Sequence, residues 1–278
     1  MGMRSGLVEG LPYSLSRWTD VPAAKWSWMK DALKAGRMVA FDPRNAIPSE
    51  WSLRPEDTLG LVFWTKDPTN IILEKHLFEE YSLKVHVTVT GWGEVERGAP
   101  DIRKGADMLA LAADQLGPEN VSWRFSPVPN VPDVVERFEQ ILGIAAYYGV
   151  RSVYLSFLQT NDLMAESRSD AERLNVLNQI AKVGDTKGVR VLLCNEDRLL
   201  ARRSNLHRNL SSGVCAPPED FALPNRNLPL SEGCGCVLMV DPFTVNETCT
   251  MGCSYCYAAD QTLSPKKRNT TRSLTVLQ

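Results

Sequence analysis

The chain has no long apolar run and no excess of charge of either sign. Its 278 residues include 31 Lys and Arg against 33 Asp and Glu, which gives a formal net charge of −2. Such a balance creates no whole-molecule field that would attract nucleic acid or an anionic membrane. The longest apolar stretch, at residues 141–150, is too short to span a bilayer. Residues 1–11 also lack the apolar segment of a secretory signal. We therefore expect a soluble cytosolic protein, in the host cytoplasm if a bacteriophage encodes it, without membrane contacts.

Cysteine is absent from the chain before Cys194, and all seven cysteines follow from there. An odd number of cysteines without an export signal argues against a disulfide framework. In a reducing compartment, grouped cysteines more often bind metal or take part in chemistry. One or two of the seven would also suit ordinary burial as small apolar side chains.

Short apolar runs alternate with segments that carry helix start and stop signals, as in repeated βα units. The expected helices cover residues 20–36, 101–117, 132–149 and 171–188. The expected strands cover residues 38–41, 59–65, 84–90, 121–125, 152–157, 189–194 and 236–241. Several of these are nearly continuous apolar runs, which is typical of strands buried on both faces of a parallel sheet. The pattern predicts an α/β fold, either a TIM-like barrel or a doubly wound sheet.

The domain organisation that we expect is simple. Residues 1–263 form a single domain with a cluster-binding region at residues 194–256, and residues 210–233 form a long ordered loop within it. Residues 264–278 form a flexible basic tail. The sequence carries no signal for the oligomeric state.

Cys249, Cys253 and Cys256 form a C-x3-C-x2-C motif. Three thiolates on one tight loop can ligate three irons of a [4Fe–4S] cubane, and Gly252 allows the loop to turn between the ligands. The fourth iron is then free to bind the amino and carboxylate groups of S-adenosylmethionine (SAM). A three-cysteine zinc site with a distant fourth ligand is the alternative.

This spacing resembles the signature of the radical SAM superfamily. Tyr255 lies at the position where the family has an aromatic residue that packs on the adenine of SAM. The resemblance implies a partial (βα)6–7 barrel, a [4Fe–4S] cluster, SAM, and a reductant such as flavodoxin or ferredoxin. In that family the motif follows the first barrel strand, whereas here it follows the last expected strand, at residues 236–241. We therefore expect a circularly permuted barrel, in which this strand closes beside residues 59–65 or their neighbour.

Nearly the whole chain also resembles an uncharacterised bacterial family with a C-terminal radical-SAM-like motif. The matching segments are S-R-W-T-D at residues 16–20, V-F-W-T-K-D-P at 62–68, W-R-F-S-P at 123–127, S-F at 156–157 and C-Y-A at 256–258. Ser126 stands where the family pattern has an acid, which puts a substrate role of that acid in doubt. The cluster loop has a weaker, local likeness to that of spore photoproduct lyase.

Cys194, Cys215, Cys234 and Cys236 remain, and four cysteines are the full ligand set of an auxiliary [4Fe–4S] cluster. A four-cysteine zinc site and unligated thiols are the alternatives. If all seven cysteines held metal, no thiol would be left to return a hydrogen atom to a substrate radical. That return would then fall to 5′-deoxyadenosine, in a redox-neutral isomerisation, or to a tyrosine.

Further candidates lie where the expected strands end, because catalytic groups of barrel enzymes sit at the carboxyl ends of strands. Lys66, Arg124 and Glu196 are the expected catalytic residues, and Lys66 or Arg124 could bind the SAM carboxylate or a phosphate. Structural ion pairing is an equally good interpretation of each. Arg17 is a candidate contact to an anionic part of the cofactor, and Asp20 is expected to cap a helix. The same rule also nominates Thr65, Thr90, Ser126, Ser156, Gln159 and Asn195, whereas His76 and His86 are poor ligand candidates.

Two basic segments of the sequence indicate which class of substrate the protein could bind. The first is a basic helical stretch with Arg198, Arg202, Arg203, His207 and Arg208, and the second is the tail with Lys266, Lys267, Arg268 and Arg272. Such patches can contact phosphates, although a solvated helix face and a soluble tail explain them too. The resulting hypothesis is a radical SAM isomerase or lyase that acts on a modified nucleobase in DNA, as in bacteriophage thymidine hypermodification. A small metabolite or peptide substrate, or a non-catalytic iron–sulfur or zinc module, are the alternatives.

Overall fold

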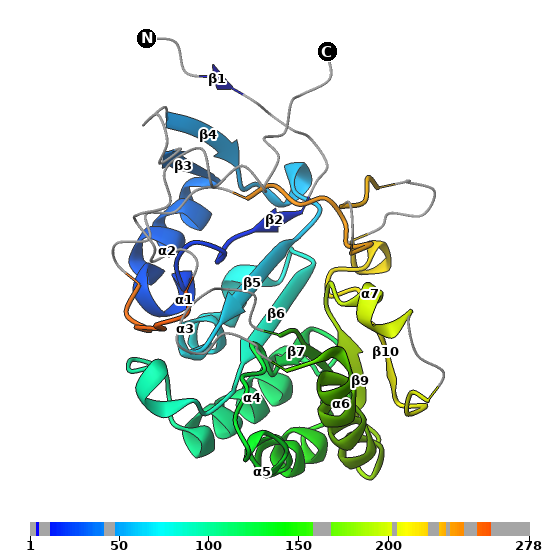
Figure 1. Cartoon of the computed structure of the whole chain (residues 1–278). Coiled ribbons are helices and arrows are strands. Elements are labelled where there is room, and N and C mark those ends of the chain that lie inside the picture. Colours follow the sequence, from blue (N-terminus) through cyan, green and yellow to red (C-terminus); the bar gives the residue numbers. More distant parts are fainter. Residues whose placement is uncertain are drawn as a thin grey trace.

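A seven-stranded, entirely parallel sheet forms the centre of the protein (Figure 1). The computed structural model describes residues 4–5, 12–41, 48–157, 168–201, 205–221, 228–231, 234–241 and 249–256. The strands of this sheet follow one another in chain order across it, as β10-β9-β8-β7-β6-β5-β2, and the two strands that lie between β2 and β5 in the chain belong to another sheet. The strands are β2 (Tyr13–Ser14), β5 (Leu61–Thr65), β6 (Leu83–Thr88), β7 (Val121–Arg124), β8 (Ser152–Leu155), β9 (Arg190–Leu193) and β10 (Leu210–Ser212). The predicted α/β class with a mainly parallel sheet is therefore confirmed.

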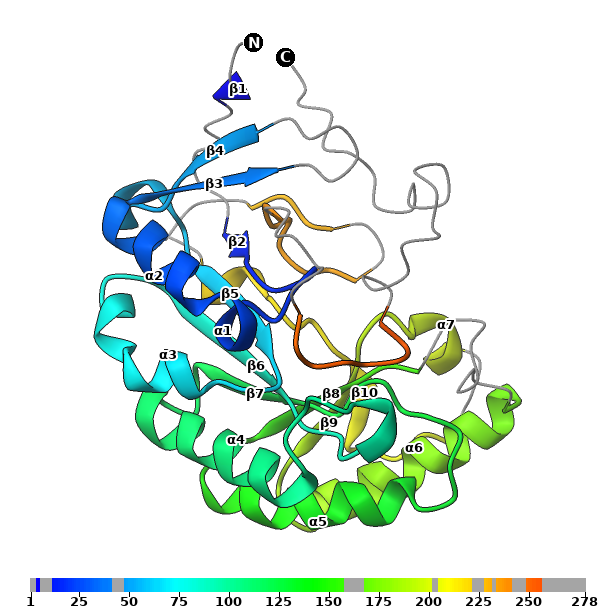
Figure 2. The ribbon, with the colours of Figure 1, turned by 90° about the vertical axis from the view of Figure 1, so that its left-hand side faces the viewer.

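Helices connect the strands and cover one side of the sheet, which curves around its other side (Figure 2). They are α3 (Thr69–Leu73), α4 (Ile102–Leu116), α5 (Val134–Tyr147) and α6 (Asp170–Asp185). The expected start signal operates at α4, where Asp101 accepts a hydrogen bond from the Lys104 amide. Helix α6 starts at a capping box of Ser169 and Glu172, which was not among the start signals expected from the sequence. Short 3-10 helices at Pro55–Asp57, Lys75–Phe78, Gly93–Val95 and Pro218–Asp220 complete the connections.

The two faces of the sheet carry different side chains, because successive residues of a strand point to opposite sides. Phe63, Val85 and Trp123 belong to the large apolar core beneath the helices. On the opposite face, Val62, Tyr154 and Leu192 belong to a second, smaller cluster that contains Cys215 and Cys236. The concave face, defined here as the side of the sheet opposite the helices, is therefore lined by a separate set of residues.

The N-terminal region differs from the prediction in two ways. Residues 20–36 form two helices, α1 (Val21–Ala24) and α2 (Trp26–Ala35), because Lys25 between them has a non-helical φ of −134°. The strand expected at residues 38–41 exists as β3 (Arg37–Phe41), but it lies outside the main sheet. It pairs antiparallel with β4 (Pro48–Ser52), which the sequence pattern missed, and β1 (Arg4–Ser5) completes this small sheet.

The C-terminal third also requires corrections. Residues 236–241 form no regular strand and make only isolated pairings, of Val237 with Leu230 and of Val240 with Tyr13. The second pairing places Val240 beside β2, the neighbour of β5, which is where we expected the chain to close. Residues 210–233 were expected to be a loop, yet they contain β10 and a 3-10 helix.

The basic helical stretch is not one helix. Helix α7 covers only Asp197–Leu200, and His207 and Arg208 follow in a non-helical segment. Arg202, Arg203 and the tail at residues 264–278 lie outside the described residues. No helix in the described part of the chain combines the length and the apolar character needed to cross a membrane.

Candidate functional site

The loop that carries the C-x3-C-x2-C motif is docked onto the segment that follows β6. Cys253 pairs antiparallel with Glu96. The Gly98 amide donates to the Met251 carbonyl at 3.0 Å, and the Ser254 amide donates to the Val95 carbonyl at 2.9 Å. Backbone hydrogen bonds therefore hold the cysteine loop at the carboxyl end of the sheet, although more than 150 residues separate the two segments in the chain.

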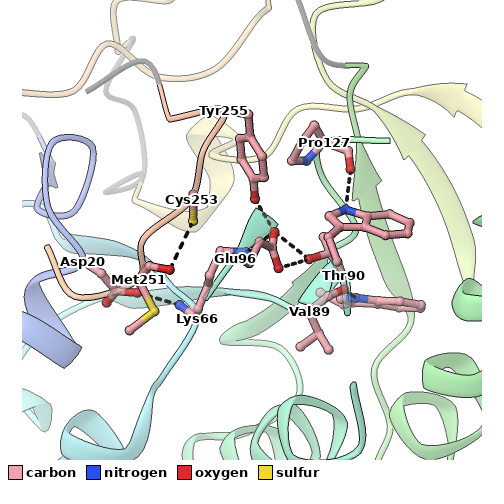
Figure 3. Close-up of polar contacts among 11 residues, drawn as sticks. Asp20, Lys66, Val89, Thr90, Glu96, Pro127, Met251, Cys253 and Tyr255 are labelled. Atoms are coloured by element: carbon pink, nitrogen blue, oxygen red, sulfur yellow. Dashed lines mark hydrogen bonds and ion pairs between the residues drawn. The ribbon is translucent and has the colours of Figure 1, made fainter. Parts of the chain in front are cut away.

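A buried polar network lies beneath this loop (Figure 3). The Tyr255 hydroxyl donates to Glu96 Oε1, and Lys66 Nζ donates to the same oxygen at 2.8 Å. The Thr90 hydroxyl lies 2.7 Å from Glu96 Oε2. Glu96 is 3% exposed, so each of these contacts is shielded from water. Burial, followed by the charge of Glu96, raises the pKa of Tyr255, which keeps the phenol protonated as the donor.

Asp20 binds the end of β5, from which Lys66 extends into this network. Besides capping α1 through the Ala23 amide at 3.3 Å, as predicted, it accepts from the Thr65 hydroxyl at 2.6 Å and the Lys66 amide at 2.7 Å. Burial raises the pKa of Asp20 to about 6, and these three hydrogen bonds limit the rise. Asp20 thus fixes the carboxyl end of β5, from which Lys66 reaches Glu96.

The three cysteines of the loop supply the right donors for an iron–sulfur cluster. Cys249, Cys253 and Cys256 are free thiols of intermediate exposure. Burial raises the pKa of Cys253 to about 11, and Gly252 adopts a left-handed φ of 59°, as expected for a tight turn between ligands. Among the described residues, no three His, Cys, Asp or Glu side chains are grouped so as to hold a single metal ion. In a cubane each thiolate binds its own iron, so the donor chemistry of this loop still fits.

An aromatic stack from strands β5, β6 and β8 lines the concave face of the sheet. The rings of Trp64 and His86 are stacked with centroids 5.5 Å apart, and Tyr154 meets His86 edge-on at 5.6 Å. His86 is fully buried, and burial lowers its pKa to about 3, so the ring is neutral. The Arg17 guanidinium lies 5.8 Å from the Trp64 ring and pairs with Asp241 at 3.9 Å. Arg17 is thus placed on this face, where its predicted role toward an anionic cofactor group remains a prediction.

The other four cysteines come together beside this stack. The Sγ atoms of Cys215 and Cys236 are 3.5 Å apart. Cys194 and Cys234 pack against the buried cluster that contains Cys215 and Cys236. Arg124, on the concave face of β7, brings a positive charge near Cys194. The four cysteines thus lie in or against one cluster, and their role as metal ligands stays a prediction.

The remaining candidates are more widely spread. Ser126 and Ser156 share a hydrogen bond between their hydroxyls. Glu196 accepts from the Phe157 amide at 3.2 Å, which ties α7 to the end of β8. Asn195 has a left-handed φ of 60°, and Gln159 lies outside the described residues. The catalytic roles of Lys66, Arg124 and Glu196 stay predictions.

Sequence reasoning missed Glu96, the residue on which the buried network converges. A signal was present, because Glu96 lies in the glycine-rich segment G-W-G-E-V-E-R-G directly after a predicted strand. The alternation of polar residues along β6 and β7, with His86 and Arg124 between apolar neighbours, likewise indicated a second functional face.

Comparison with known proteins identifies a family. The model of the family described as "Domain of unknown function (DUF1848)" matches residues 13–258. No curated protein matches the chain. Among solved structures, a xylose isomerase domain protein from Planctomyces limnophilus is 16% identical over 46% of this chain and 51% of that chain, with a TM-score of 0.30. The match thus spans about half of the solved protein, and at this TM-score it carries no argument about fold or function.

Proposed function

The chain belongs to the DUF1848 family, and we propose that it is a radical SAM enzyme. The observation that carries the proposal is the C-x3-C-x2-C loop, docked by backbone pairing onto the carboxyl end of a parallel α/β sheet. Catalytic groups in such folds gather at this end of the strands. A structural zinc loop would not need the buried network of Tyr255, Glu96 and Lys66 beneath it.

The cofactors would be held by residues of three segments. Cys249, Cys253 and Cys256 would bind the three irons of a [4Fe–4S] cluster. A cluster bound here would supply the electron for reductive cleavage of SAM, and hydrogen-atom abstraction from the substrate would follow. Tyr255 and Glu96 fix the orientation of the loop from below, and Gly252 provides its turn. Arg17 lies on the concave face, where a guanidinium suits the SAM carboxylate.

The proposal includes a circularly permuted barrel. In the radical SAM layout the cluster loop follows the first strand of the barrel. Here the segment before the loop runs beside β2, at the edge of the main sheet, through the pairing of Val240 with Tyr13. A segment from the end of the chain thus occupies the position beside the N-terminal strand, and this placement supports the permutation.

We further propose that the substrate is a modified nucleobase in DNA, in an isomerase or lyase reaction. The concave face combines a partly exposed aromatic ring, Trp64, with two guanidiniums, Arg17 and Arg124. Bases stack on aromatic rings, and arginine binds phosphate in a bidentate fashion. A base within a duplex would have to be extruded to reach this face, at a cost of a few kcal/mol. A small metabolite or a peptide is the second candidate.

Anaerobic reconstitution tests the proposal. The protein is loaded with iron and sulfide, and 5′-deoxyadenosine is measured after addition of SAM and either dithionite or reduced flavodoxin. We expect brown protein that forms 5′-deoxyadenosine, and a Cys253→Ser variant that forms none. Deuterated DNA, nucleosides and peptides are then compared for deuterium transfer into 5′-deoxyadenosine.

Two results would contradict the proposal at different levels. Colourless protein that binds only zinc would favour a non-catalytic metal-binding module. Cleavage of SAM without deuterium transfer from any DNA, together with DNA binding that is absent or insensitive to salt, would remove the nucleic-acid substrate and leave the enzyme class intact.

A further inference from the structure

Four cysteines from three separate segments gather on the concave face. Cys194 follows β9, Cys215 follows β10, and Cys234 and Cys236 belong to the returning segment at residues 234–241. The Sγ atoms of Cys215 and Cys236 are 3.5 Å apart, and Cys194 and Cys234 pack against the buried cluster that contains both residues. All four cysteines therefore lie in or against the same cluster.

The sulfur positions exclude a disulfide in this structure. All four residues are free thiols, and the Sγ atoms of Cys215 and Cys236 lie well beyond the S–S bond length of about 2.05 Å. Ordinary core packing does not explain the group either. Burial as small apolar side chains would account for one or two cysteines, whereas here all four cysteines outside the cluster loop lie in or against one buried cluster.

The surroundings are those of a shielded metal centre. Val62, Leu192 and Phe221 are buried in the same cluster as Cys215 and Cys236, and they would limit the access of water to bound metal. Arg124 brings a positive charge to the Cys194 end of the group, where it offsets the negative charge of thiolate ligands. Thiolates are soft donors that select iron–sulfur clusters or zinc among the common biological metals.

The spacing of the ligands favours a cluster over zinc. Structural zinc sites usually take their cysteines from C-x2–4-C pairs, and this group contains none, since its one close pair is Cys234-Gly235-Cys236. In a cubane each thiolate binds a different iron, so the sulfurs are arranged around a cluster and need not converge on one ion. This requirement suits a group in which Cys215 and Cys236 lie together and Cys194 and Cys234 pack against the same cluster.

We propose that Cys194, Cys215, Cys234 and Cys236 bind a second iron–sulfur cluster on the concave face, independent of the cluster loop at residues 249–256. The two sites share no ligand, so each can be tested without the other. Because all four corners of this cluster would be occupied by cysteine, it would not bind SAM. Its expected role is to transfer electrons or to shape the substrate pocket.

The test uses the full-length chain with the first site removed. In the variant Cys249→Ala/Cys253→Ala/Cys256→Ala, the changes lie on the docked loop and leave the second group untouched. After anaerobic reconstitution we expect about eight iron atoms per chain in the parent protein and about four in this variant, since each [4Fe–4S] cluster holds four. The reduced variant should give an electron paramagnetic resonance signal that SAM does not shift.

A second variant distinguishes loss of the second cluster from misfolding of the protein. Cys194→Ser/Cys234→Ser changes the two partly exposed members of the group and spares the buried Cys215 and Cys236. This variant should retain about four irons and a signal that SAM does shift. Iron-free or zinc-only protein in the triple-alanine variant would overturn the second cluster, as would an unchanged iron content in the double-serine variant. Neither result would affect the proposal for the cluster loop.

Discussion

The Tyr255 hydroxyl donates to a carboxylate oxygen of Glu96, which lies 159 residues earlier in the chain. This contact connects the cysteine loop to the end of the sheet, because the same carboxylate is held from the other side by Lys66 and Thr90. A hydrogen bond to a charged group contributes about 1.5–3 kcal/mol. It is therefore a substantial part of what keeps this short loop docked.

Tyr255→Phe should loosen the docking of the loop without unfolding the protein. Removal of the hydroxyl deletes one hydrogen bond, while Glu96 keeps its other partners. We expect hydrogen exchange of the amides at residues 249–256 to accelerate about 10- to 100-fold, which corresponds to the free energy of one such bond. Tyr147→Phe, at a side chain that is 82% exposed, is the matched control. Equal exchange in both variants would show that the hydroxyl does not hold the loop.

Gly98→Ala should prevent the loop from docking. A Cβ atom at position 98 would lie 1.7 Å from the backbone carbonyl oxygen of Thr250, so only a shift of the main chain could relieve the clash. We expect the variant to fold but to bind much less iron than the parent protein after reconstitution. Gly143→Ala serves as the control, because a Cβ at position 143 in α5 meets nothing within 4 Å and alanine favours the helix. Normal iron content in Gly98→Ala would contradict the docking described here.

The stability of the iron-free protein should depend on pH through Asp20. Its pKa is about 6 in the folded protein and 3.8 as the ordinary value, so the folded state binds more protons between these limits. The contribution of this group to stability is therefore present below about pH 4 and is lost as the pH rises through about 6, at a cost of about 3 kcal/mol.

The measurement is urea unfolding at intervals from pH 4 to pH 7. The parent protein should lose about 2.4 kcal/mol more than Asp20→Asn across this range, because asparagine does not titrate. Parallel curves for the two proteins would show that burial does not raise the pKa of Asp20. The comparison between two variants removes the contributions of the other carboxyl groups, which both proteins share.

The positive charge of Arg124 should raise the reduction potential of the second cluster. A positive charge beside a ligating sulfur favours the reduced, more negative state of an iron–sulfur cluster, and Arg124 brings such a charge near Cys194. In the triple-alanine variant described above, Arg124→Gln should therefore make the reduction potential more negative, and Arg124→Lys should restore part of the difference because it keeps the charge. A potentiometric titration followed by electron paramagnetic resonance measures this. The same reduction potential in all three proteins would show that Arg124 does not act on the second cluster.

Much of the main sheet could be predicted from the sequence. The strands β5 to β9 and the helices α4 to α6 lie close to their predicted positions, because apolar runs mark the strands and capping or glycine signals mark the helices. Strands β2 and β10 were missed, since two or three residues are too few to show a period. Residues 236–241 resemble a strand in composition, but they find only isolated pairing partners.

The sequence by itself determined the chemistry that this protein can offer, namely three thiols on one short loop and four more within the region at residues 194–236. Residue type and close spacing are local properties, so they can be read from the sequence without a structure. Only the tertiary structure decided that Glu96 lies beneath Tyr255, that Cys194 packs against the cluster with Cys215 and Cys236, and that Val240 runs beside β2. These contacts join segments far apart in the chain. Alternation along a strand indicates which side a residue faces, but no local pattern encodes how the parallel sheet curves or which distant segment packs on it.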